Sequence, residues 1–514
     1  EANEEGIFEI YTVADLQKFA KIAPVFAPRT EAKLMATIDM TGIEWTPIDG
    51  FIHTFNGNNN AIKGLSAPLF GVGEAKIHDL TLTDVAIEVS SNLYTGTLAN
   101  VINNGAVVNC SASGSLIYHQ AAPNGVAVGG LVGKVNGCEF TNNTNRVNIT
   151  VVGEMTEDLL NNYILRVGGL AATLENPVGK MEKSYNYGTI NITKDIDRLS
   201  VGGLIGFVDA ALHMDDCHNH GKMLLAANVQ GTSFSTFAGI SGSIDAGFDT
   251  VNPTFTVTNC SNDAVVVLGE EGGEDVIPTV GKTVYYTHIG GLFGYTRDTE
   301  KDYYDVKLEN CTNNGNIDVN AVSASSHIKL GGFFTQVTTD LTMTNCHNNG
   351  KIGFTRSVTD GAPGTMYVGG MIGHVVGSND ETSLFSLINC SNKGELYTSK
   401  NIYNKGILYT GGVTGYVSAA SHLSLTNFSN SGALNFANKI MDSNIYIGSL
   451  SGYLAGDELT VSGFTNDGDI TADVTLDELS NNTYIGGIIG HNGSKKNNKF
   501  ENVVNNGDIT ATGA

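Results

Sequence analysis

Carboxylates, a thiol and imidazoles lie close together in one short polar segment, Met214 to Gly221 (MDDCHNHG). Adjacent Asp and His side chains are the residue types that perform general acid–base chemistry. Alignment with the repeats described below assigns them other roles, because Asp216 takes the place of an asparagine and Cys217 points inward. Asn219 then joins a row of stacked amides, and His218 and His220 become turn residues. We therefore interpret this segment as a structural turn.

The familiar motifs for catalysis and metal binding are missing from the sequence. His-Glu-x-x-His, Gly-x-Ser-x-Gly and phosphate-binding glycine loops do not occur. No Cys-x-x-Cys pair occurs either, so a zinc site is not expected. The sequence thus predicts no catalytic residues, no metal and no cofactor, and hence a protein that is not an enzyme.

Two sets of aromatic side chains are stronger candidates for function. A tyrosine precedes an inward-facing residue in four consecutive copies of a glycine-rich strand, at Tyr367, Tyr409, Tyr446 and Tyr484. A second outward position carries His374, Tyr416 and Tyr453, with Tyr295 and His491 in the flanking copies. Stacked strands bring such residues side by side, and exposed tyrosines offer flat apolar faces with hydroxyl groups. We predict that the four tyrosines, His374, Tyr416 and Tyr453 bind a ligand. The alternative is that the rings only stack on each other or lie under loops.

A repeat of about 38 residues positions these side chains and occupies the chain from Ala67 onward. Its first half is a turn of the form Asn-Cys-x-Asn-x-Gly, as from Asn345 to Gly350. The second asparagine of this turn recurs at Asn142, Asn186, Asn219, Asn262, Asn313, Asn348, Asn392, Asn430, Asn466 and Asn505. The second half reads apolar-Gly-Gly-apolar-x-Gly and starts at Val128, Val167, Val201, Phe237, Ile289, Leu330, Val368, Thr410, Ile447 and Ile485.

This repeat predicts an all-β fold, a right-handed parallel β-helix (a solenoid) of about 10–11 coils. The recurring asparagine suits a ladder of stacked amides, and the neighbouring glycine suits a turn with positive φ. The units lack a 3.6-residue period, which argues against a helical solenoid, whereas a β-propeller is a weaker alternative. Val368, Met371 and Val375 exemplify the positions expected to face inward.

Residues 1–66 differ from the repeat, and we predict that they cap the β-helix formed by residues 67–514. The segment from Thr12 to Ile22 is amphipathic, with Thr12 as N-cap, and predicts a short helix that ends before Pro24. The segment from Phe51 to Leu65 predicts a hairpin, because turn residues lie between apolar flanks.

The cysteines follow the repeat. Six occupy one repeat position, at Cys110, Cys217, Cys260, Cys311, Cys346 and Cys390, and other copies carry Phe140, Ser184, Phe428, Phe464 and Val503 there. A position that exchanges Cys with Phe and Val is apolar, so we predict buried free thiols. Disulfides between coils or a string of metal ions are the alternatives. Cys138 lies off this position and is predicted to be the more exposed thiol.

Composition limits the classes of partner. The net charge of −24 disfavours nucleic acid and anionic lipid. No apolar run approaches the ~20 residues that a membrane-spanning helix needs. The polar start at Glu1 is not a signal peptide, so the numbering of an exported protein would begin after cleavage.

The glycine-rich half of the repeat resembles the GLUG-motif repeats of bacterial surface proteins. Matching segments include VGGLVG (128–133), VGGLIG (201–206), IGGLFG (289–294), VGGMIG (368–373) and IGGIIG (485–490), and TVADLQKFA, IDMTGIEWTPI and FNGNNNAIKGL resemble the usual entry to such arrays. GLUG arrays occur in adhesins and beside immunoglobulin-A-cleaving metallopeptidases. Because this sequence lacks the His-Glu-x-x-His motif of those peptidases, the resemblance implies adhesion or display rather than proteolysis.

These features together predict a monomeric, adhesin-like bacterial protein, secreted or on the cell surface, that binds glycans or host or microbial proteins along one face of the solenoid. The first alternative is a polysaccharide-active lyase or hydrolase on a β-helix scaffold. Such an enzyme should carry convergent carboxylates, Lys or Arg on one outward face, and the only cations registered there are Lys134, Arg166, Lys329 and scattered histidines. The second alternative is a structural spacer for a further C-terminal module.

Overall fold

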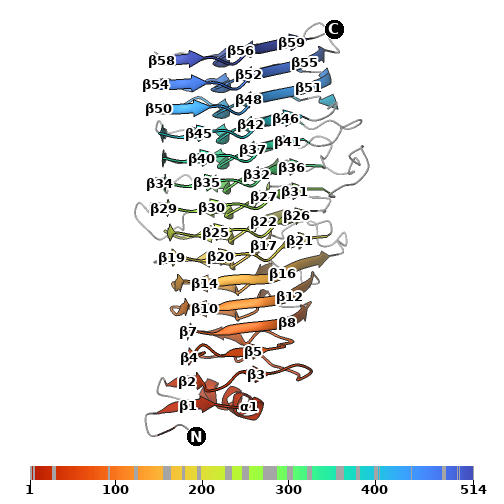
Figure 1. The fold of residues 1–514 in the computed structure, drawn as a ribbon, viewed down its shortest axis with the longest axis vertical. Coiled ribbons are helices and arrows are strands. Elements are labelled where there is room, and N and C mark those ends of the chain that lie inside the picture. Colours follow the sequence, from red (N-terminus) through yellow and green to blue (C-terminus); the bar gives the residue numbers. More distant parts are fainter. Residues whose placement is uncertain are drawn as a thin grey trace.

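The computed structural model describes the chain outside residues 1–2, 4–5, 26–29, 91–92, 121–125, 154–163, 176–179, 194–197, 226–233, 246–253, 270–285, 298–304, 321–326, 355–363, 378–382, 399–402, 405, 442, 477–481, 495, 497 and 513–514. The described strands stack coil upon coil into a rod, with the N-terminal coils at one end and the C-terminal coils at the other (Figure 1). Neighbouring coils pair in parallel, as Tyr367 with Tyr409 and Asn348 with Asn392. The predicted parallel β-helix is confirmed.

Three sheets run along the rod. Sheet B has 12 strands: β6 (Phe70–Gly73), β10 (Ala99–Asn103), β14 (Val132–Asn136), β18 (Ala171–Glu175), β23 (Ile205–Asp209), β28 (Ser241–Asp245), β33 (Phe293–Arg297), β38 (Phe334–Val337), β43 (Ile372–Val375), β49 (Thr414–Val417), β53 (Ser451–Leu454) and β57 (Ile489–Asn492). Sheet C has 11 strands: β9 (Tyr94–Gly96), β13 (Val126–Gly129), β17 (Ile164–Gly168), β22 (Arg198–Gly202), β27 (Phe234–Ala238), β32 (Tyr286–Gly290), β37 (His327–Gly331), β42 (Met366–Gly369), β48 (Leu408–Gly411), β52 (Ile445–Gly448) and β56 (Thr483–Gly486).

Sheet A contains the other 36 strands and begins in the N-terminal coils with β1 (Ile7–Ile10), β2 (Glu31–Leu34), β3 (Ile38–Asp39), β4 (Thr54–Asn56), β5 (Ala61–Lys63), β7 (Lys76–His78) and β8 (Thr81–Val89). It continues through β11 (Ala106–Val108), β12 (Ser111–Gln120), β15 (Glu139–Thr141), β16 (Thr144–Gly153), β19 (Lys180–Glu182), β20 (Tyr185–Asn186), β21 (Ile190–Ile192), β24 (His213–Asp215), β25 (His218–Asn219), β26 (Met223–Leu225), β29 (Thr254–Thr258), β30 (Ser261–Asn262) and β31 (Val266–Leu268). Its C-terminal part comprises β34 (Asp305–Glu309), β35 (Thr312–Asn313), β36 (Ile317–Val319), β39 (Leu341–Thr344), β40 (His347–Asn348), β41 (Ile352–Phe354), β44 (Ser383–Ile388), β45 (Ser391–Asn392), β46 (Leu396–Thr398), β47 (Tyr403–Asn404), β50 (Ser421–Asn430), β51 (Leu434–Met441), β54 (Glu458–Asn466), β55 (Ile470–Leu476), β58 (Lys499–Asn505) and β59 (Ile509–Thr512).

A row of asparagines, all buried except the exposed Asn505, connects the coils of sheet A. In each neighbouring pair the Nδ2 group donates a hydrogen bond to Oδ1 of the asparagine in the next coil, at 2.6–3.0 Å. The same amides also hold their own turns, since Asn348 Nδ2 donates to the carbonyl of Gly350 at 3.1 Å. We call this set the amide row; it consists of Asn145, Asn186, Asn219, Asn262, Asn313, Asn348, Asn392, Asn430, Asn466 and Asn505.

One copy of the repeat was aligned three residues out of register. Asn145, not Asn142, pairs with Asn186 in the amide row. Asn142 instead lies in the turn, with a φ of 55°. Asn143, not Phe140, occupies the cysteine position, where its Oδ1 accepts a hydrogen bond from the Cys110 N–H at 3.0 Å. Three asparagines within four residues satisfy the pattern in more than one way, so spacing alone could not choose among them.

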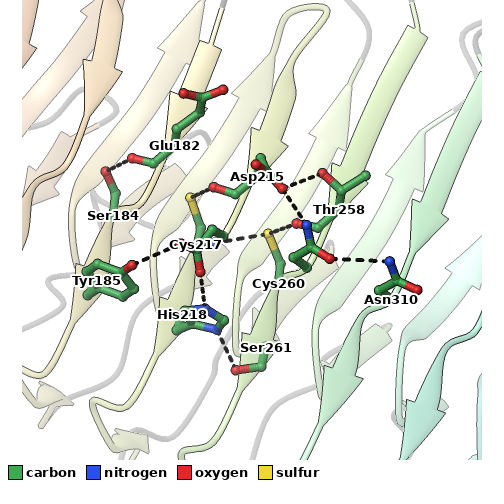
Figure 2. Close-up of polar contacts among 12 residues, drawn as sticks. Glu182, Ser184, Tyr185, Asp215, Cys217, His218, Thr258, Cys260, Ser261 and Asn310 are labelled. Atoms are coloured by element: carbon green, nitrogen blue, oxygen red, sulfur yellow. Dashed lines mark hydrogen bonds and ion pairs between the residues drawn. The ribbon is translucent and has the colours of Figure 1, made fainter.

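All seven cysteines are free and buried. In the six-cysteine column, the Cys217 N–H donates to Cys260 Sγ at 3.4 Å (Figure 2), and burial raises the pKa of Cys110 to about 12. The predicted buried thiols are confirmed for this column. The prediction for Cys138 is wrong, because its side chain is 2% exposed and its Sγ donates to the carbonyl of Ile102 at 3.2 Å.

One α-helix is present among the described residues: α1 (Val13–Ile22) packs against the N-terminal coils and is followed by a 3-10 turn, η1 (Ala23–Val25). Thr12 Oγ1 accepts from the Asp15 N–H, and Asp15 Oδ2 accepts from the Thr12 N–H, so both groups form a capping box. The buried Phe19 ring lies 5.6 Å from the Phe8 ring and 5.9 Å from the Phe51 ring. The predicted helix is confirmed. Among the described residues no helix is long and apolar enough to cross a membrane.

The predicted hairpin between Phe51 and Leu65 is wrong. β4 pairs in parallel with β2 and β7, whereas β5 pairs in parallel with β3 and β8. The turn between them does exist, with positive φ at Asn58 and Asn59, but it leads the chain around a corner instead of reversing it. Sheet A therefore continues through residues that the sequence assigned to the cap, and a domain boundary near residue 66 stays a prediction.

We expect Asn348→Ala to lower the free energy of unfolding by roughly 2–4 kcal/mol, because it leaves buried donors and acceptors of Asn313 and Asn392 without their partner. The matched control is Asn349→Ala, which removes an exposed amide bonded to Asn314 and should change stability by less than about 0.5 kcal/mol. Urea denaturation monitored by circular dichroism measures both. Equal shifts in the two variants would contradict a dominant role for the amide row.

Candidate functional site

The four predicted tyrosines form a continuous stack on sheet C. Tyr367, Tyr409, Tyr446 and Tyr484 are in direct register on β42, β48, β52 and β56. Their ring centroids are separated by 5.4, 5.2 and 4.8 Å along the stack, with interplanar angles of 20°, 12° and 2°. The parallel register therefore does bring these residues side by side, and we call them the tyrosine row.

The second predicted set forms a similar series on sheet B, in which His374 meets Tyr416 edge-on at 5.1 Å and the later rings stack. His374, Tyr416 and Tyr453 are in register on β43, β49 and β53, and His491 on β57 continues the series. The Tyr416 and Tyr453 rings stack at 5.3 Å, and Tyr453 and His491 stack at 4.8 Å. We call these four residues the mixed row.

The two rows pack against each other and form one surface. Within a coil, the glycine pair between β42 and β43 brings Tyr367 within 4.6 Å of His374, centroid to centroid. In the later coils the contacts are edge-on, at 5.1 Å for Tyr446 and Tyr453 and 5.2 Å for Tyr484 and His491. We call the eight residues of both rows the aromatic face.

Stacking determines which parts of these rings a ligand can reach. Tyr446 is 8% exposed, and the other seven side chains of the aromatic face are partly exposed. The rings do stack on each other, as the alternative stated, and each interior ring has its faces covered by neighbours. Edges and hydroxyl groups are what remains for a partner. Burial raises the pKa of Tyr409 and of Tyr416, so these hydroxyls stay protonated hydrogen-bond donors at neutral pH.

Polar groups replace the rings in the preceding coils. Lys329 is in register with Tyr367, is 4% exposed, and places its Nζ 5.2 Å from the Tyr367 ring centroid. Its ammonium group donates to Gln336 Oε1, and burial lowers the pKa of Lys329 to about 7. In the coil before, His288 shares a hydrogen bond with Thr335 Oγ1 at 2.8 Å. The side chains at these outward positions are therefore covered, because those on sheet C pack against those on sheet B.

His374 lies where the polar side chains of the preceding coils meet the aromatic face, between Gln336 and Tyr416. Both of its ring nitrogens are buried and have no hydrogen-bond partner within the part of the chain that the structure describes. Burial and the nearby Lys329 hold the pKa of His374 well below its usual range. The imidazole is therefore neutral at physiological pH and packs as an aromatic ring against Tyr367.

Two acidic residues that the sequence analysis missed, Glu175 and Asp209, lie on sheet B in coils that precede the aromatic face. Glu175 forms ion pairs with Lys134 and Arg166, and the Arg166 guanidinium lies 4.1 Å from the centroid of the Phe207 ring. Asp209 is in register with Glu175, and burial together with Glu175 raises the pKa of Asp209. Glu175 and Asp209 occupy the same repeat position, eight residues after Val167 and Val201, which begin their glycine-rich halves. The sequence analysis considered only positions up to seven residues after this start, so it missed them.

The ion pairs change the interpretation of this charged cluster. The sequence analysis registered Lys134 and Arg166 as cations at outward positions, and the structure pairs both with Glu175. Among the described residues no group of three or more His, Cys, Asp or Glu side chains is arranged to hold a metal ion. The polar segment from Met214 also differs from its prediction, because His218 lies on strand β25 rather than in a turn.

The buried ammonium group of Lys329 should make stability depend on pH. Its pKa is about 7 in the folded protein against 10.5 in the unfolded chain, so the unfolded state binds more protons between these values and stability rises with pH across this window. We expect Lys329→Met to flatten this rise, measured as the denaturation midpoint from pH 7 to 10. The exposed Lys76→Met serves as control and should leave the rise intact. An unchanged pH profile in Lys329→Met would contradict the depressed pKa.

Comparison with known proteins identifies a group of relatives. No family model matches the chain, so the resemblance to GLUG-motif repeats stays a prediction. The chain is 27% identical to the immunoglobulin A1 protease of Streptococcus pneumoniae over 237 residues, 46% of this chain and 11% of that protein. It is 28% identical to the immunoglobulin A1 protease of Streptococcus sanguinis over 188 residues, 36% of this chain and 9% of that protein. The matches thus span about a tenth of the length of these curated relatives.

A crystal structure of a protein provisionally named as an immunoglobulin A1 protease from Bacteroides ovatus also matches. It is 15% identical and covers 68% of this chain and 78% of that chain, with a TM-score of 0.31.

These comparisons overturn the prediction that the protein is not an enzyme, because the relatives are named as proteases. The prediction relied on missing catalytic motifs. Since the match covers only about a tenth of each relative, the lack of His-Glu-x-x-His in this chain is no argument against an enzyme.

Proposed function

We propose that the protein is secreted by, or displayed on, a bacterium and that its aromatic face binds a protein partner. The observation that carries this proposal is the aromatic face itself, eight rings in register over consecutive coils and mostly part-exposed. Tyrosine is enriched in protein interfaces because it adds a hydroxyl group to a large apolar surface. The names of the relatives support an extracellular setting, because immunoglobulins are extracellular proteins.

Ring orientation favours a protein over a glycan as the partner. A sugar ring binds an aromatic side chain by lying flat on its face, whereas the interior rings of the tyrosine row stack on both sides at 4.8–5.4 Å. The accessible hydroxyl edges repeat at the spacing of the coils, about 4.8 Å. An extended peptide segment that lies along the rod can form hydrogen bonds with these hydroxyl groups through its backbone donors and acceptors.

Immunoglobulin A1 is the first partner to test, because it is the protein for which the relatives are named. We place the protein among adhesin-like surface proteins with GLUG-type repeats as part of the same proposal. The net charge of −24 supports a partner that is neither nucleic acid nor an anionic membrane.

The test measures binding to immobilised immunoglobulin A1 and to a panel of host and microbial surface proteins, with a glycan array in parallel. The triple variant Tyr409→Phe, Tyr416→Phe, Tyr453→Phe keeps the stacked rings and removes three hydroxyl groups. We expect it to weaken protein binding about tenfold or more, since each lost hydrogen bond contributes roughly 0.5–1.5 kcal/mol. Tyr187→Phe, an exposed tyrosine outside the aromatic face, should leave affinity unchanged.

Two outcomes would contradict the proposal. Protein binding that persists in the triple variant, and also in a variant with all four residues of the tyrosine row changed to Ala, would remove the aromatic face as the contact surface. Binding to glycans without binding to any protein of the panel would replace the protein partner with a carbohydrate. Circular dichroism of each variant separates loss of contact from loss of fold.

A further inference from the structure

A serine, a histidine and an aspartate form a hydrogen-bonded series on the outer side of sheet A. His218 on β25 places Nδ1 2.8 Å from Oγ of Ser261, which lies on β30 in the next coil. The other ring nitrogen, Nε2, lies 2.8 Å from Oδ1 of Asp216. Figure 2 shows His218 joined to Ser261 between neighbouring strands, away from the sulfur atoms of Cys217 and Cys260.

The carboxylate decides where the protons of this series lie. Asp216 can only accept, so Nε2 of a neutral His218 must carry the hydrogen that it donates. Nδ1 is then the acceptor, and the Ser261 hydroxyl donates to it. Asp263 Oδ2, 3.1 Å from Ser261 Oγ, competes with His218 Nδ1 for this single hydrogen and is also 3.1 Å from His220 Nδ1. With the hydrogen directed to His218, the arrangement is that of a nucleophile, a base and an acid that fixes the tautomer of the base.

Another coil contains the same His–Ser pair without the acid. His347 Nδ1 lies 2.8 Å from Ser391 Oγ, but the residue two positions before His347 is Asn345. Asn345 and Asp216 have almost the same backbone conformation, with φ of 53° and 54°. Since the fold forms the His–Ser pair with asparagine at this position, Asp216 is not needed to position the imidazole. What it adds is a negative charge beside the His218 imidazole.

Solvent reaches this group of side chains. The side chains of His218 and Asp216 are 24% and 40% exposed. Tyr185 stacks on the His218 ring at 5.5 Å, and its hydroxyl donates to Asp216 Oδ2 at 3.3 Å. The imidazole is thus held from one side by a ring and at one nitrogen by the carboxylate, while Ser261 remains partly exposed.

We propose that Ser261, His218 and Asp216 form a site for acyl transfer to Ser261 from ester substrates. Ser261 Oγ forms a bond with the ester carbonyl carbon while its proton passes to His218 Nδ1. The bond to the alcohol oxygen breaks, and His218 returns the proton to that oxygen. Water then attacks acyl-Ser261 with His218 as base, which releases the carboxylic acid and restores the Ser261 hydroxyl. Asp216 contributes its negative charge beside the imidazolium that forms during the reaction, and it takes no part in the proton transfer.

Backbone hydrogen bonding indicates how large the rate acceleration can be and which class of substrate can react. The N–H of Ser261 donates to the carbonyl of Cys217 at 3.1 Å within the sheet, so it is not available to stabilise a developing oxyanion. The acceleration is therefore that of a general base, about 10²–10⁴-fold, which suits activated esters rather than peptide bonds.

The test uses a fluorophosphonate probe and p-nitrophenyl acetate on the full chain, with the modified serine identified by mass spectrometry. We expect Ser261 to be labelled. Asp216→Asn introduces the residue that the repeat carries at Asn345, so the variant should fold. It should lower the rate of labelling at Ser261 at least tenfold. Ser261→Ala should lose the label at this position.

Unchanged labelling of Ser261 in Asp216→Asn would overturn the role of the acid, and no labelling of Ser261 in the unaltered protein would overturn the site. His218→Phe preserves a ring to stack on Tyr185 and should lower the rate of labelling of Ser261 at least tenfold. Labelling of Ser261 at an unchanged rate in His218→Phe would likewise contradict the proposal. Circular dichroism confirms that each variant is folded.

Discussion

A buried amide is tolerated only when its donors and acceptors are satisfied, and here each buried asparagine of the amide row, from Asn145 to Asn466, finds its partner in the next coil. The requirement extends to the other half of the repeat. A side chain on Gly370 would overlap both Asn392 of the following coil and the carbonyl of Gly412. The glycine pair and the asparagine are therefore parts of one contact, because the glycine leaves the space that the amide fills. Register between coils follows from this contact.

Fixed register turns sequence variation into surface zones. The column on sheet C runs through Arg166, Ser200, Thr236, His288, Lys329 and Tyr367 in successive coils. Within this column Arg166 and Lys329 are charged, the side chains between them are polar, and aromatic rings follow from Tyr367 toward the C-terminal coils. The scaffold beneath these zones is the same, so each zone can acquire its own chemistry without any change in the core.

Repeat spacing predicted the β-helix, the amide row and the thiol column, because each depends on residues that must recur at one position. Prediction failed where the pattern was locally degenerate. Asn142, Asn143 and Asn145 satisfy the same motif, and only the pairing of Asn145 with Asn186 distinguishes them. Cys138 lies outside the column, yet it is buried under the turn at Gly105, whose N–H donates to its sulfur.

Features that depend on contacts between coils could not be read from single positions. The pairing of Glu175 with Lys134 joins neighbouring strands, β18 and β14, and the Ser261–His218 contact joins residues 43 positions apart. The hairpin was expected because a turn between apolar flanks is the usual sign of reversal. In a solenoid the same turn forms a corner, and only the long-range pairing of β4 and β5 with other coils reveals the difference. The function of the relatives could not be inferred from motifs in a chain that matches about a tenth of their length.

The amide row also gives the rod an electrical direction. Every bond between its members runs the same way, from Nδ2 of one coil to Oδ1 of the next coil toward the C-terminus. The amide dipoles therefore add head to tail, and bonds in such a chain polarise one another. Their sum is an internal dipole whose positive end points toward the C-terminal coils. A strongly anionic molecule thus carries a polarised axis through its interior, shielded from salt by the surrounding core.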